Sequence, residues 1–381
     1  MAVLWGLALV VWAVALFNCA RLTLYACRRL GTSRSGAREN FQAFSPISIL
    51  KPLCGIDPGL EQNLEAFFRL DYPELELLFC VADESDPAAE IVRKLQARYP
   101  KVPATLFFAP SRLGFNPKIN NLAPAYETAR HEWLLFSDSN VRPSPDYLTT
   151  MMAELEPDTG LLSVLLCGRE AEGLGGKLAA MFLNTLYARG TLGSELVGRP
   201  PAQGKSMLIR RSVVERFGGL PVMANVHADD IRAGMEVTKL GLKVQLMRDP
   251  LAQTIGRSSF ATFWSRNLRW GRSRRGRFPL FFAIEPLFGS LVSGLLGAAA
   301  LHHFFGLDIG LVIGLHLAAW FLCDLVLIRL VSRELSWDTP WYWALRQALA
   351  LPLWLHTAFV NRIDWRGNEL DFRNDVRASG W

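Results

Sequence analysis

Residues that build disulfide frameworks and structural metal sites are scarce in this sequence. It contains six cysteines and six histidines among 381 residues. No cysteine pair has the spacing of a zinc site or of a thioredoxin-like redox motif. These absences exclude a small domain stabilised by zinc or disulfides. The cysteines are expected to be reduced thiols that face the cytosol.

Glycine-rich phosphate loops are missing as well. Gly204-Lys205-Ser206 resembles the end of a P-loop, but the glycine that this motif requires five residues before Gly204 is Arg199. The glycines between residues 173 and 176 do not fit the first β-α turn, where a dinucleotide-binding loop would lie. The sequence therefore lacks both of these nucleotide-binding motifs.

Basic residues are not spread over one face with aromatic residues between them, as nucleic-acid binding requires. The formal net charge is +6, and the arginines gather beside apolar runs, at residues 28–38 and 266–277. Clusters in such positions fit the positive-inside rule and attraction to anionic lipid. We therefore expect a membrane as partner and no nucleic acid.

Long apolar runs are what the sequence has in excess, since half of its residues are hydrophobic. Val3–Ala20 and Pro286–Leu307 carry no charge, and Ile309–Ile328 is apolar except for Asp324. Each run is long enough to span a bilayer. A further run, Trp341–Val360, is broken by polar residues and a proline. It is expected to lie in the membrane interface or to form a bent span.

These runs predict how the chain is divided. Large residues continue beyond the first run without a cleavage site, so residues 1–27 are predicted to be an uncleaved anchor. Residues 28–45 read as a basic linker, and residues 46–280 as a cytosolic catalytic domain. Residues 281–381 form a C-terminal membrane region with two predicted spans, the interrupted run and a basic tail. Asp324 is costly inside a membrane, so a partner or a substrate role is expected for it.

Short apolar strands alternate with amphipathic helices after the linker. The expected strands are Ile47–Leu50, Leu75–Val81, Thr105–Phe108 and Trp133–Phe136. The expected helices are Gly59–Arg69, Ala88–Tyr99 and Leu122–Ala129. This order predicts an α/β fold with a doubly wound, mostly parallel sheet. Ligands of such sheets bind beyond the carboxyl ends of the strands.

Carboxylates follow the second and fourth expected strands. Asp83 is predicted to hydrogen-bond the uracil or ribose of a nucleotide-sugar donor, although a helix N-cap is the alternative for Asp83 and Asp138. Asp138, with Asn140, is the candidate ligand of a divalent cation, Mg²⁺ or Mn²⁺. Such a cation neutralises a diphosphate leaving group. A carboxylate near the acceptor can take the hydroxyl proton, and Asp230 of Asp229-Asp230 is the candidate for this general base.

A basic and aromatic segment lies further along the chain, at Arg266-x-x-Arg269-Trp270. The planar guanidinium of Arg269 is suited to pair with a diphosphate, and Trp270 can shape a sugar pocket. The alternative is that Arg269 contacts lipid headgroups.

These motifs resemble those of glycosyltransferase family 21, the ceramide glucosyltransferases. The resemblance rests on Ser48–Gly55, Asn63–Phe68, Leu70–Pro73, Asn116–Leu122, Asp138–Arg142 and Arg266-x-x-Arg269-Trp270, and it covers nearly the whole chain. It implies a GT-A fold and an inverting transfer of glucose from UDP-glucose to the primary hydroxyl of ceramide, giving β-glucosylceramide. The donor-binding residues that it implies are Lys51, Asp83, Lys118, Asp138, Arg266, Arg269 and Trp270.

The sequence departs from the family pattern in three places. Asn140 stands where a full D-x-D motif has an acidic residue, and Asp229 stands where a glutamate is expected. Tyr187 replaces an expected His-Pro pair within Lys177–Val197, a segment predicted to be an amphipathic ramp for the lipid.

Several functions therefore stay open at this stage. The acceptor could be ceramide, a hopanoid or diacylglycerol, and the sugar could be another hexose. A processive polysaccharide synthase and a non-catalytic membrane scaffold are the rival classes. Arginine greatly outnumbers lysine, which indicates a GC-rich, bacterial genome and hence an inner membrane. A eukaryotic member would lie in the Golgi.

Overall fold

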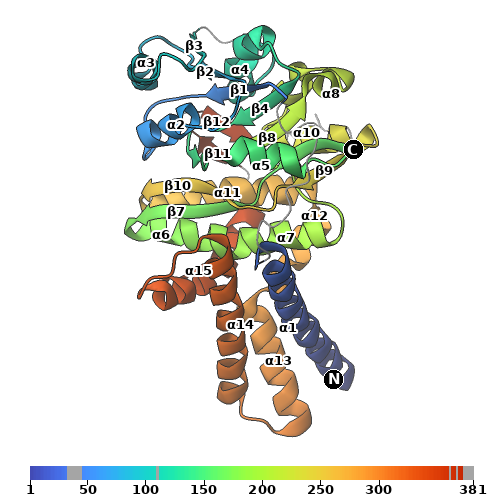
Figure 1. The fold of residues 1–381 in the computed structure, drawn as a ribbon. Helices are drawn as coiled ribbons and strands as arrows, with labels where there is room; N and C mark the ends of the chain where they lie inside the picture. Colours follow the sequence, from blue (N-terminus) through green and yellow to red (C-terminus); the bar gives the residue numbers. More distant parts are fainter. Residues whose placement is uncertain (32–44, 109–110, 360–361, 366–367, 372–381) are drawn as a thin grey trace. The chain divides into compact units, whose positions relative to one another are not determined.

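The computed structural model describes residues 1–31, 45–108 and 111–359, together with the backbone of residues 362–365 and 368–371. The chain forms two compact units (Figure 1). The helical unit consists of Met1–Thr32, Ala171–Gly193 and Arg257–Trp381, and the sheet unit of Ser33–Glu170 and Ser194–Gly256.

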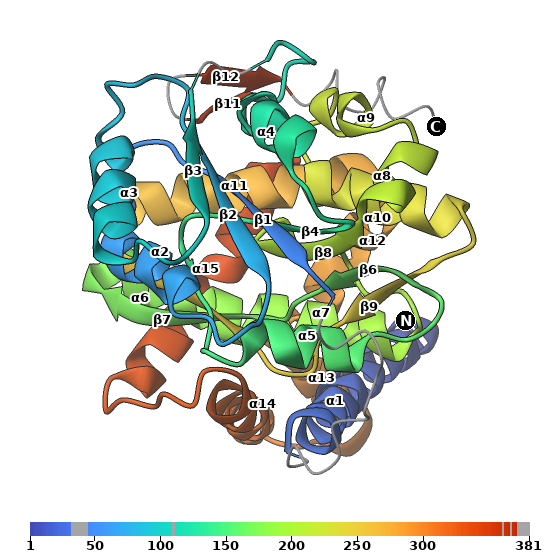
Figure 2. The ribbon, with the colours of Figure 1, turned by 45° about the horizontal axis from the view of Figure 1, so that its top comes forward.

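A seven-stranded sheet in the order β3-β2-β1-β4-β8-β6-β9 forms the sheet unit's centre (Figure 2). Its strands are β1 (Ile47–Pro52), β2 (Leu75–Cys80), β3 (Ala104–Phe107), β4 (Trp133–Ser137), β6 (Thr159–Ser163), β8 (Ser206–Arg210) and β9 (Lys243–Leu246). Strand β1 runs parallel to β2 and β4, and β2 runs parallel to β3. Strand β8 is antiparallel to β4 and β6. The predicted α/β, mostly parallel sheet is confirmed.

A smaller sheet has the order β5-β10-β7. Its strands are β5 (Val141–Arg142), β7 (Leu166–Glu172) and β10 (Leu251–Arg257). The helices of the sheet unit are α2 (Leu60–Phe68), α3 (Pro87–Arg98), α4 (Pro117–Thr128), α5 (Tyr147–Glu154), α8 (Arg211–Arg216), α9 (Leu220–Ala224) and α10 (Asp229–Lys239).

Helix α4 begins well before the expected Leu122. Asn116 caps it, because its Oδ1 accepts hydrogen bonds from the backbone N–H groups of Lys118 and Ile119. Pro117 occupies the first turn, where a missing N–H costs nothing. The early start places Lys118 in the first turn of the helix, and this position decides what its ammonium can reach.

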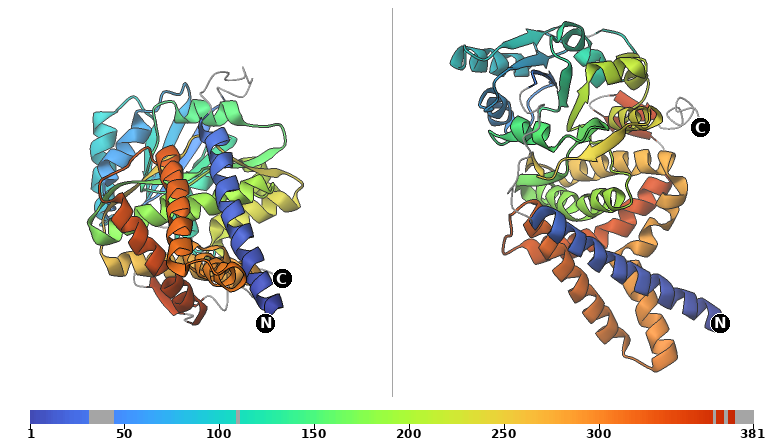
Figure 3. Two further views of the ribbon diagram at one scale, coloured as in Figure 1. Left: turned by 90° about the horizontal axis from the view of Figure 1, so that it is seen from below. Right: turned by 45° about the vertical axis from the view of Figure 1, so that its right-hand side comes forward.

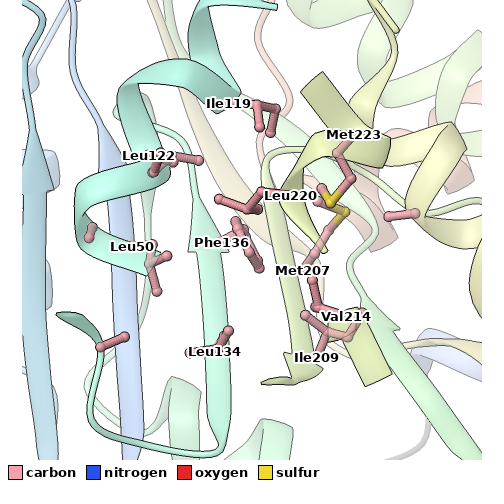
Figure 4. Close-up of a cluster of buried hydrophobic side chains, with 14 of the residues drawn as sticks. Leu50, Ile119, Leu122, Leu134, Phe136, Met207, Ile209, Val214, Leu220 and Met223 are labelled. Carbon is pink, nitrogen blue, oxygen red and sulfur yellow. The ribbon is translucent and has the colours of Figure 1, made fainter. Parts of the chain in front are cut away.

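The core beside α4 is continuous and fully apolar. Leu50 from β1, Phe136 from β4 and Met207 from β8 point toward Ile119 and Leu122 of α4 (Figure 4). All of these side chains are at most 2% exposed. Burying one such side chain stabilises the fold by about 1.5–3 kcal/mol, so this cluster fixes α4 against the sheet.

The helical unit contains helices α1 (Ala2–Gly31), α6 (Gly173–Phe182), α7 (Ala188–Leu196), α11 (Phe260–Arg277), α12 (Pro279–Ile284), α13 (Ser290–Phe305), α14 (Ile309–Val331) and α15 (Thr339–Phe359). A π-helical turn, Leu183–Tyr187, joins α6 to α7, and a 3-10 turn, Glu285–Phe288, joins α12 to α13. Two short strands, β11 (Arg362–Trp365) and β12 (Asn368–Asp371), form an antiparallel hairpin.

Helices α1, α13 and α14 lie side by side (Figure 3). Glycines permit their close approach, since a Cβ on Gly297 of α13 would lie 2.2 Å from the indole of Trp12 on α1. Helices α1 and α14 are each long and apolar enough to cross a membrane. The segments Pro279–Phe288 and Ser290–Phe305 pass the same test together, with a bend of 58° between them. Among the described residues, α15 does not pass it.

Asp324 of α14 is fully buried and has the expected partner. Its Oδ1 lies 2.6 Å from the guanidinium of Arg189, and its Oδ2 accepts a hydrogen bond of 2.9 Å from the indole N–H of Trp343. The cost of burying this carboxylate is therefore offset by charge and hydrogen bonding.

Candidate active site

The carboxylate of Asp138 lies directly after β4, between two lysines. Its Oδ1 is 3.1 Å from Nζ of Lys118, and its Oδ2 accepts a hydrogen bond of 2.9 Å from Nζ of Lys205. Burial by itself would raise the pKa of Asp138, but the two ammonium groups outweigh it and hold the pKa well below its usual range. Asp138 is therefore ionised at neutral pH.

Lys118 connects this carboxylate to the start of α10. Its ammonium lies 2.9 Å from Oδ2 of Asp229 and donates to the carbonyl of Gly204 at 3.1 Å. Burial would lower the pKa of Lys118, but the charges of Asp138 and Asp229 outweigh burial and raise it. Lys118 therefore stays charged, and one ammonium serves two carboxylates.

Asp230 occupies the first turn of α10. Its Oδ2 accepts a hydrogen bond of 2.8 Å from the N–H of Gly204, and its Oδ1 accepts one of 2.8 Å from the N–H of Ile231. A Cβ at position 204 would lie 3.1 Å from Oδ2 of Asp230 and 3.2 Å from Nζ of Lys118, which favours glycine there. Burial, and then the charge of Asp229, raise the pKa of Asp230. A carboxylate with a raised pKa is a stronger base than an ordinary one.

Asp138 and Asn140 offer oxygens that fit a cation. Nζ of Lys205 donates to Oδ2 of Asp138 and to Oδ1 of Asn140, at 2.9 Å each. The two oxygens therefore already converge on one positively charged group, and carboxylate and amide oxygens suit a hard divalent ion. Within the described part of the chain, no three His, Cys, Asp or Glu side chains are grouped to hold a metal ion. A metal at this position would need further oxygens from a ligand such as a diphosphate.

Lys51 lies beneath the Asp138 loop and is fully buried. Its ammonium donates to the carbonyl of Asp138 at 2.9 Å and to Oγ of Ser137 at 3.2 Å, and it lies 3.5 Å from the ring centre of Phe67. Burial lowers the pKa of Lys51 well below its usual value. These contacts fix the backbone from which the Asp138 carboxylate projects.

Asp83 is exposed after the end of β2. Its carboxylate accepts hydrogen bonds from the N–H of Ser85 at 2.7 Å and from the hydroxyl of Ser85 at 2.6 Å. The N-cap of the following helix α3 is Asp86, whose carboxylate accepts from the N–H of Ala88. The helix-cap alternative is therefore wrong for Asp83. It is also wrong for Asp138, which precedes the short strand β5.

The segment with Arg266, Arg269 and Trp270 belongs to the helical unit, on α11. The guanidinium of Arg266 lies 5.3 Å from the ring centre of Trp270, and the ring of Tyr187 meets Trp270 edge-on at 4.9 Å. The hydroxyl of Tyr187 donates to Oδ1 of Asn267 at 2.9 Å. Burial lowers the pKa of Arg266. Tyr187, the departure from the family pattern, thus packs directly against Trp270 of this motif.

Sequence reasoning missed Lys205 as a site residue and gave Asp229 no role. The triplet Gly204-Lys205-Ser206 was weighed only as a P-loop. The pairing of β4 with β8 places Ser206 opposite Ser137, so that Lys205 lies beside Asp138. Lys205 could be recognised as a site residue only from the register between β4 and β8, which periodicity in the sequence does not reveal.

Comparison with known proteins shows the family of this chain. The sequence model of glycosyl transferase family 21 matches residues 7–378. Ceramide glucosyltransferase 1 of Caenorhabditis elegans is 30% identical over 87% of this chain and 73% of its own length. Ceramide glucosyltransferase 3 of the same organism is 32% identical over 84% of this chain and 72% of its own length.

The fold is also found among solved structures. A mannosyltransferase from Pyrobaculum calidifontis, solved with GDP-mannose and Mn²⁺, superposes with a TM-score of 0.51 at 18% identity. The match covers 93% of this chain and 99% of that one. Together with the sheet order, it confirms the expected GT-A fold.

Proposed function

We propose that this protein, which belongs to glycosyltransferase family 21, transfers glucose from UDP-glucose to the primary hydroxyl of ceramide. The product is β-glucosylceramide and the by-product is UDP. The observation that carries the proposal is the arrangement around Lys118: it contacts Asp138 and Asp229 directly and binds Gly204, whose N–H holds Asp230. The carboxylate of Asp138, which lies between two lysines, and the carboxylate of Asp230, whose pKa is raised, thus lie together at the carboxyl end of β4.

The donor diphosphate is assigned to the side of Asp138. Lys118 and Lys205 supply positive charge there, and Asp138 and Asn140 would hold a divalent cation. When bound, the cation neutralises the charge that develops on the departing diphosphate. Asp83 is assigned to the uracil or ribose, and Lys51 supports the Asp138 loop from below.

Asp230 is assigned as the general base. It accepts the proton of the acceptor hydroxyl as that oxygen bonds to the anomeric carbon. The bond from this carbon to the phosphate oxygen breaks, and its electron pair leaves with UDP. Attack from the face opposite UDP inverts the configuration and gives the β-glycoside.

Arg266, Arg269 and Trp270 are assigned to the donor as well. The guanidinium of Arg269 is suited to pair with the diphosphate, since its planar fork matches phosphate oxygens. The guanidinium of Arg266 over the ring of Trp270, and the edge-on contact of Tyr187 with that ring, give this segment a fixed shape.

The proposed organisation follows the apolar helices. Residues 1–27 anchor the chain, residues 46–280 form the cytosolic transferase domain, and residues 281–381 form a membrane region. The candidate spans α1 and α14 and the bent pair around Gly289 support a multi-pass membrane protein. Such a protein belongs in a bacterial inner membrane, or in the Golgi of a eukaryote. Most of the linker 28–45 and the side chains of the basic tail lie outside the described residues.

Product identification tests the proposal. Membranes containing the full-length protein are incubated with labelled UDP-glucose, a divalent cation and ceramide, hopanoid or diacylglycerol in separate reactions. Mass spectrometry is expected to find one hexose on ceramide, with β configuration by NMR. A polymeric product would identify a polysaccharide synthase instead, and glucose on another lipid alone would reassign the acceptor.

A further inference from the structure

The helical unit contains a cleft of about 80 Å³ that the proposed donor site does not use. Its walls come from the end of α6 and the π-helical turn, α11, the α12–3-10 segment, the start of α13, and α15. One part of its wall is apolar and includes Phe282, Leu351 and Trp354. Another part is polar and includes Glu285, Arg346 and Gln347. A small cleft with both kinds of wall suits a ligand that is itself polar at one end and apolar at the other.

The polar wall is well ordered by contacts within the unit. Gln347 is 5% exposed, and its Oε1 accepts hydrogen bonds from the hydroxyl of Ser290 at 2.6 Å and from Arg346 at 2.7 Å. Arg346 is 6% exposed. Glu285 pairs through Oε1 with Arg274 at 3.3 Å. These side chains are therefore held in place without a ligand.

Each of these polar side chains nevertheless keeps an unsatisfied atom. Among the described residues, Nε2 of Gln347, Nε of Arg346 and Oε2 of Glu285 are buried and have no hydrogen-bond partner. Buried polar atoms are nearly always hydrogen-bonded, so each exception calls for an explanation. Nε of Arg274, which also lines the cleft, is likewise buried without a partner among the described residues. Three unused donors and one unused acceptor in the wall of a single cleft indicate a ligand with both kinds of group.

The apolar wall lies where a candidate membrane segment begins. Segments Pro279–Phe288 and Ser290–Phe305 are the bent pair, and Leu280 and Phe281 of α12 are largely exposed. Within the cleft, the ring of Trp354 stacks on Phe282 at 5.3 Å, and its indole N–H donates to the carbonyl of Phe282. An exposed apolar helix beside the cleft gives an alkyl chain a path from the bilayer.

We infer that this cleft binds the polar head of the acceptor lipid, a neutral head with amide and hydroxyl groups. This inference rests on the proposed function and adds the place where the acceptor is recognised. Gln347 and Arg346 donate to the amide or hydroxyl oxygen, Glu285 accepts from a hydroxyl or amide N–H, and the alkyl chain leaves past Phe282 and Trp354. A phosphate head offers mainly acceptor oxygens and would leave Oε2 of Glu285 without a donor, so an anionic phospholipid fits less well.

Ligand binding can be measured without turnover, because Trp354 lies in the cleft. Full-length protein in nanodiscs is titrated with a short-chain ceramide that carries bromine on its acyl chain, and the quenching of tryptophan fluorescence is recorded. Gln347→Leu removes one unused donor, and Leu351→Phe narrows the cleft without adding a tryptophan. Both are expected to weaken ceramide binding about tenfold or more, while UDP binding stays unchanged.

Leu355→Ala is the matched control, since Leu355 lies on the same helix, is 42% exposed and does not line the cleft. It should bind ceramide as the unchanged protein does. Unchanged ceramide affinity in both Gln347→Leu and Leu351→Phe would overturn the site, even if the enzyme glucosylates ceramide. Quenching by a brominated anionic phospholipid in preference to ceramide would overturn it too. Failure of the proposed function would show differently, as absence of glucosylceramide from the unchanged protein.

Discussion

Two aspartates, the half-buried Asp138 in the sheet unit and the buried Asp324 in the helical unit, share one charge pattern. Each carboxylate lies between two basic side chains. Asp324 meets Arg189 at 2.6 Å and Arg346 at 3.9 Å, and Asp138 meets Lys118 at 3.1 Å and Lys205 at 2.9 Å. Their surroundings differ in access: the side chain of Asp324 is 1% exposed, whereas that of Asp138 is 22% exposed.

The partners differ as much as the access does. Asp324 is held by a guanidinium and an indole N–H, which are rigid donors that point from fixed planes. The lysines at Asp138 are flexible point charges, and each is shared with another acceptor, Asp229 or Asn140. The buried ion pair at Asp324 stabilises the fold. The accessible carboxylate at Asp138, whose lysines are shared with other acceptors, can exchange a lysine for a bound cation. The same charge pattern therefore serves structure in one unit and is available for chemistry in the other.

The largest expected effect lies in the sheet unit, at Asp230. Asp230→Asn removes the proton acceptor and should lower kcat by roughly 10²–10⁴-fold, with UDP binding retained. Because burial and Asp229 raise the pKa of Asp230, kcat of the unchanged enzyme should fall as pH decreases through that raised pKa. The residual kcat of the variant should lack this fall. Steady-state kinetics across pH and calorimetry with UDP measure both effects.

Lys239→Met serves as the control, since Lys239 ends the same helix α10 and its side chain is 58% exposed. It should leave both kcat and the pH profile unchanged. Near-normal turnover by Asp230→Asn would show that Asp230 is not the base. The carboxylates around Lys118 would then be structural, like the buried carboxylate of Asp324.

The next effect concerns stability, in the helical unit. Asp324→Asn leaves Arg189 and Arg346 buried without a full counter-charge, and should destabilise the unit by about 3–5 kcal/mol. The double replacement Arg189→Met with Asp324→Leu removes one charge of each sign and should recover part of this loss, because Arg346 stays buried with its hydrogen bond to Gln347. Denaturant titration in detergent micelles measures the change. If the single variant were as stable as the unchanged protein, the contrast between the two aspartates would fail.

Much of the fold could be predicted because local pattern and burial agree. The expected strands at Leu75 and Trp133 are present within one or two residues of their predicted ends, since continuous apolar runs are buried on both faces of the sheet. The start of α4 was misplaced because Asn116 and Pro117 form its cap, while the apolar periodicity becomes clear only at Leu122. Capping chemistry, not hydrophobicity, sets that boundary.

Candidate site residues could be predicted where a motif ends a strand or, as for Lys118, where the family resemblance includes them. Asp138 follows β4 directly and was identified by that position. Lys205 precedes β8, and only the antiparallel register of β8 with β4 brings it to Asp138. The partner of Asp324 is similar, since Arg189 lies 135 residues away in the sequence. Long-range pairings of this kind depend on topology, and local spacing contains no record of them.

The smallest expected effect tests whether the cation at Asp138 can be exchanged. Lys205→Met removes the ammonium that Asp138 and Asn140 share. Their two oxygens are then free to bind a metal ion without competition from Lys205. Mn²⁺ should then bind in the absence of UDP-glucose about tenfold more tightly, which corresponds to roughly 1.4 kcal/mol. Electron paramagnetic resonance of free Mn²⁺ measures this directly. Arg189→Met provides the contrast, because Asp324 stays enclosed by α14 and Trp343 and should gain no Mn²⁺. Equal Mn²⁺ affinity in Lys205→Met and the unchanged protein would show that Lys205 does not compete with a metal for these oxygens, and the exchange of cations at Asp138 would then be ruled out.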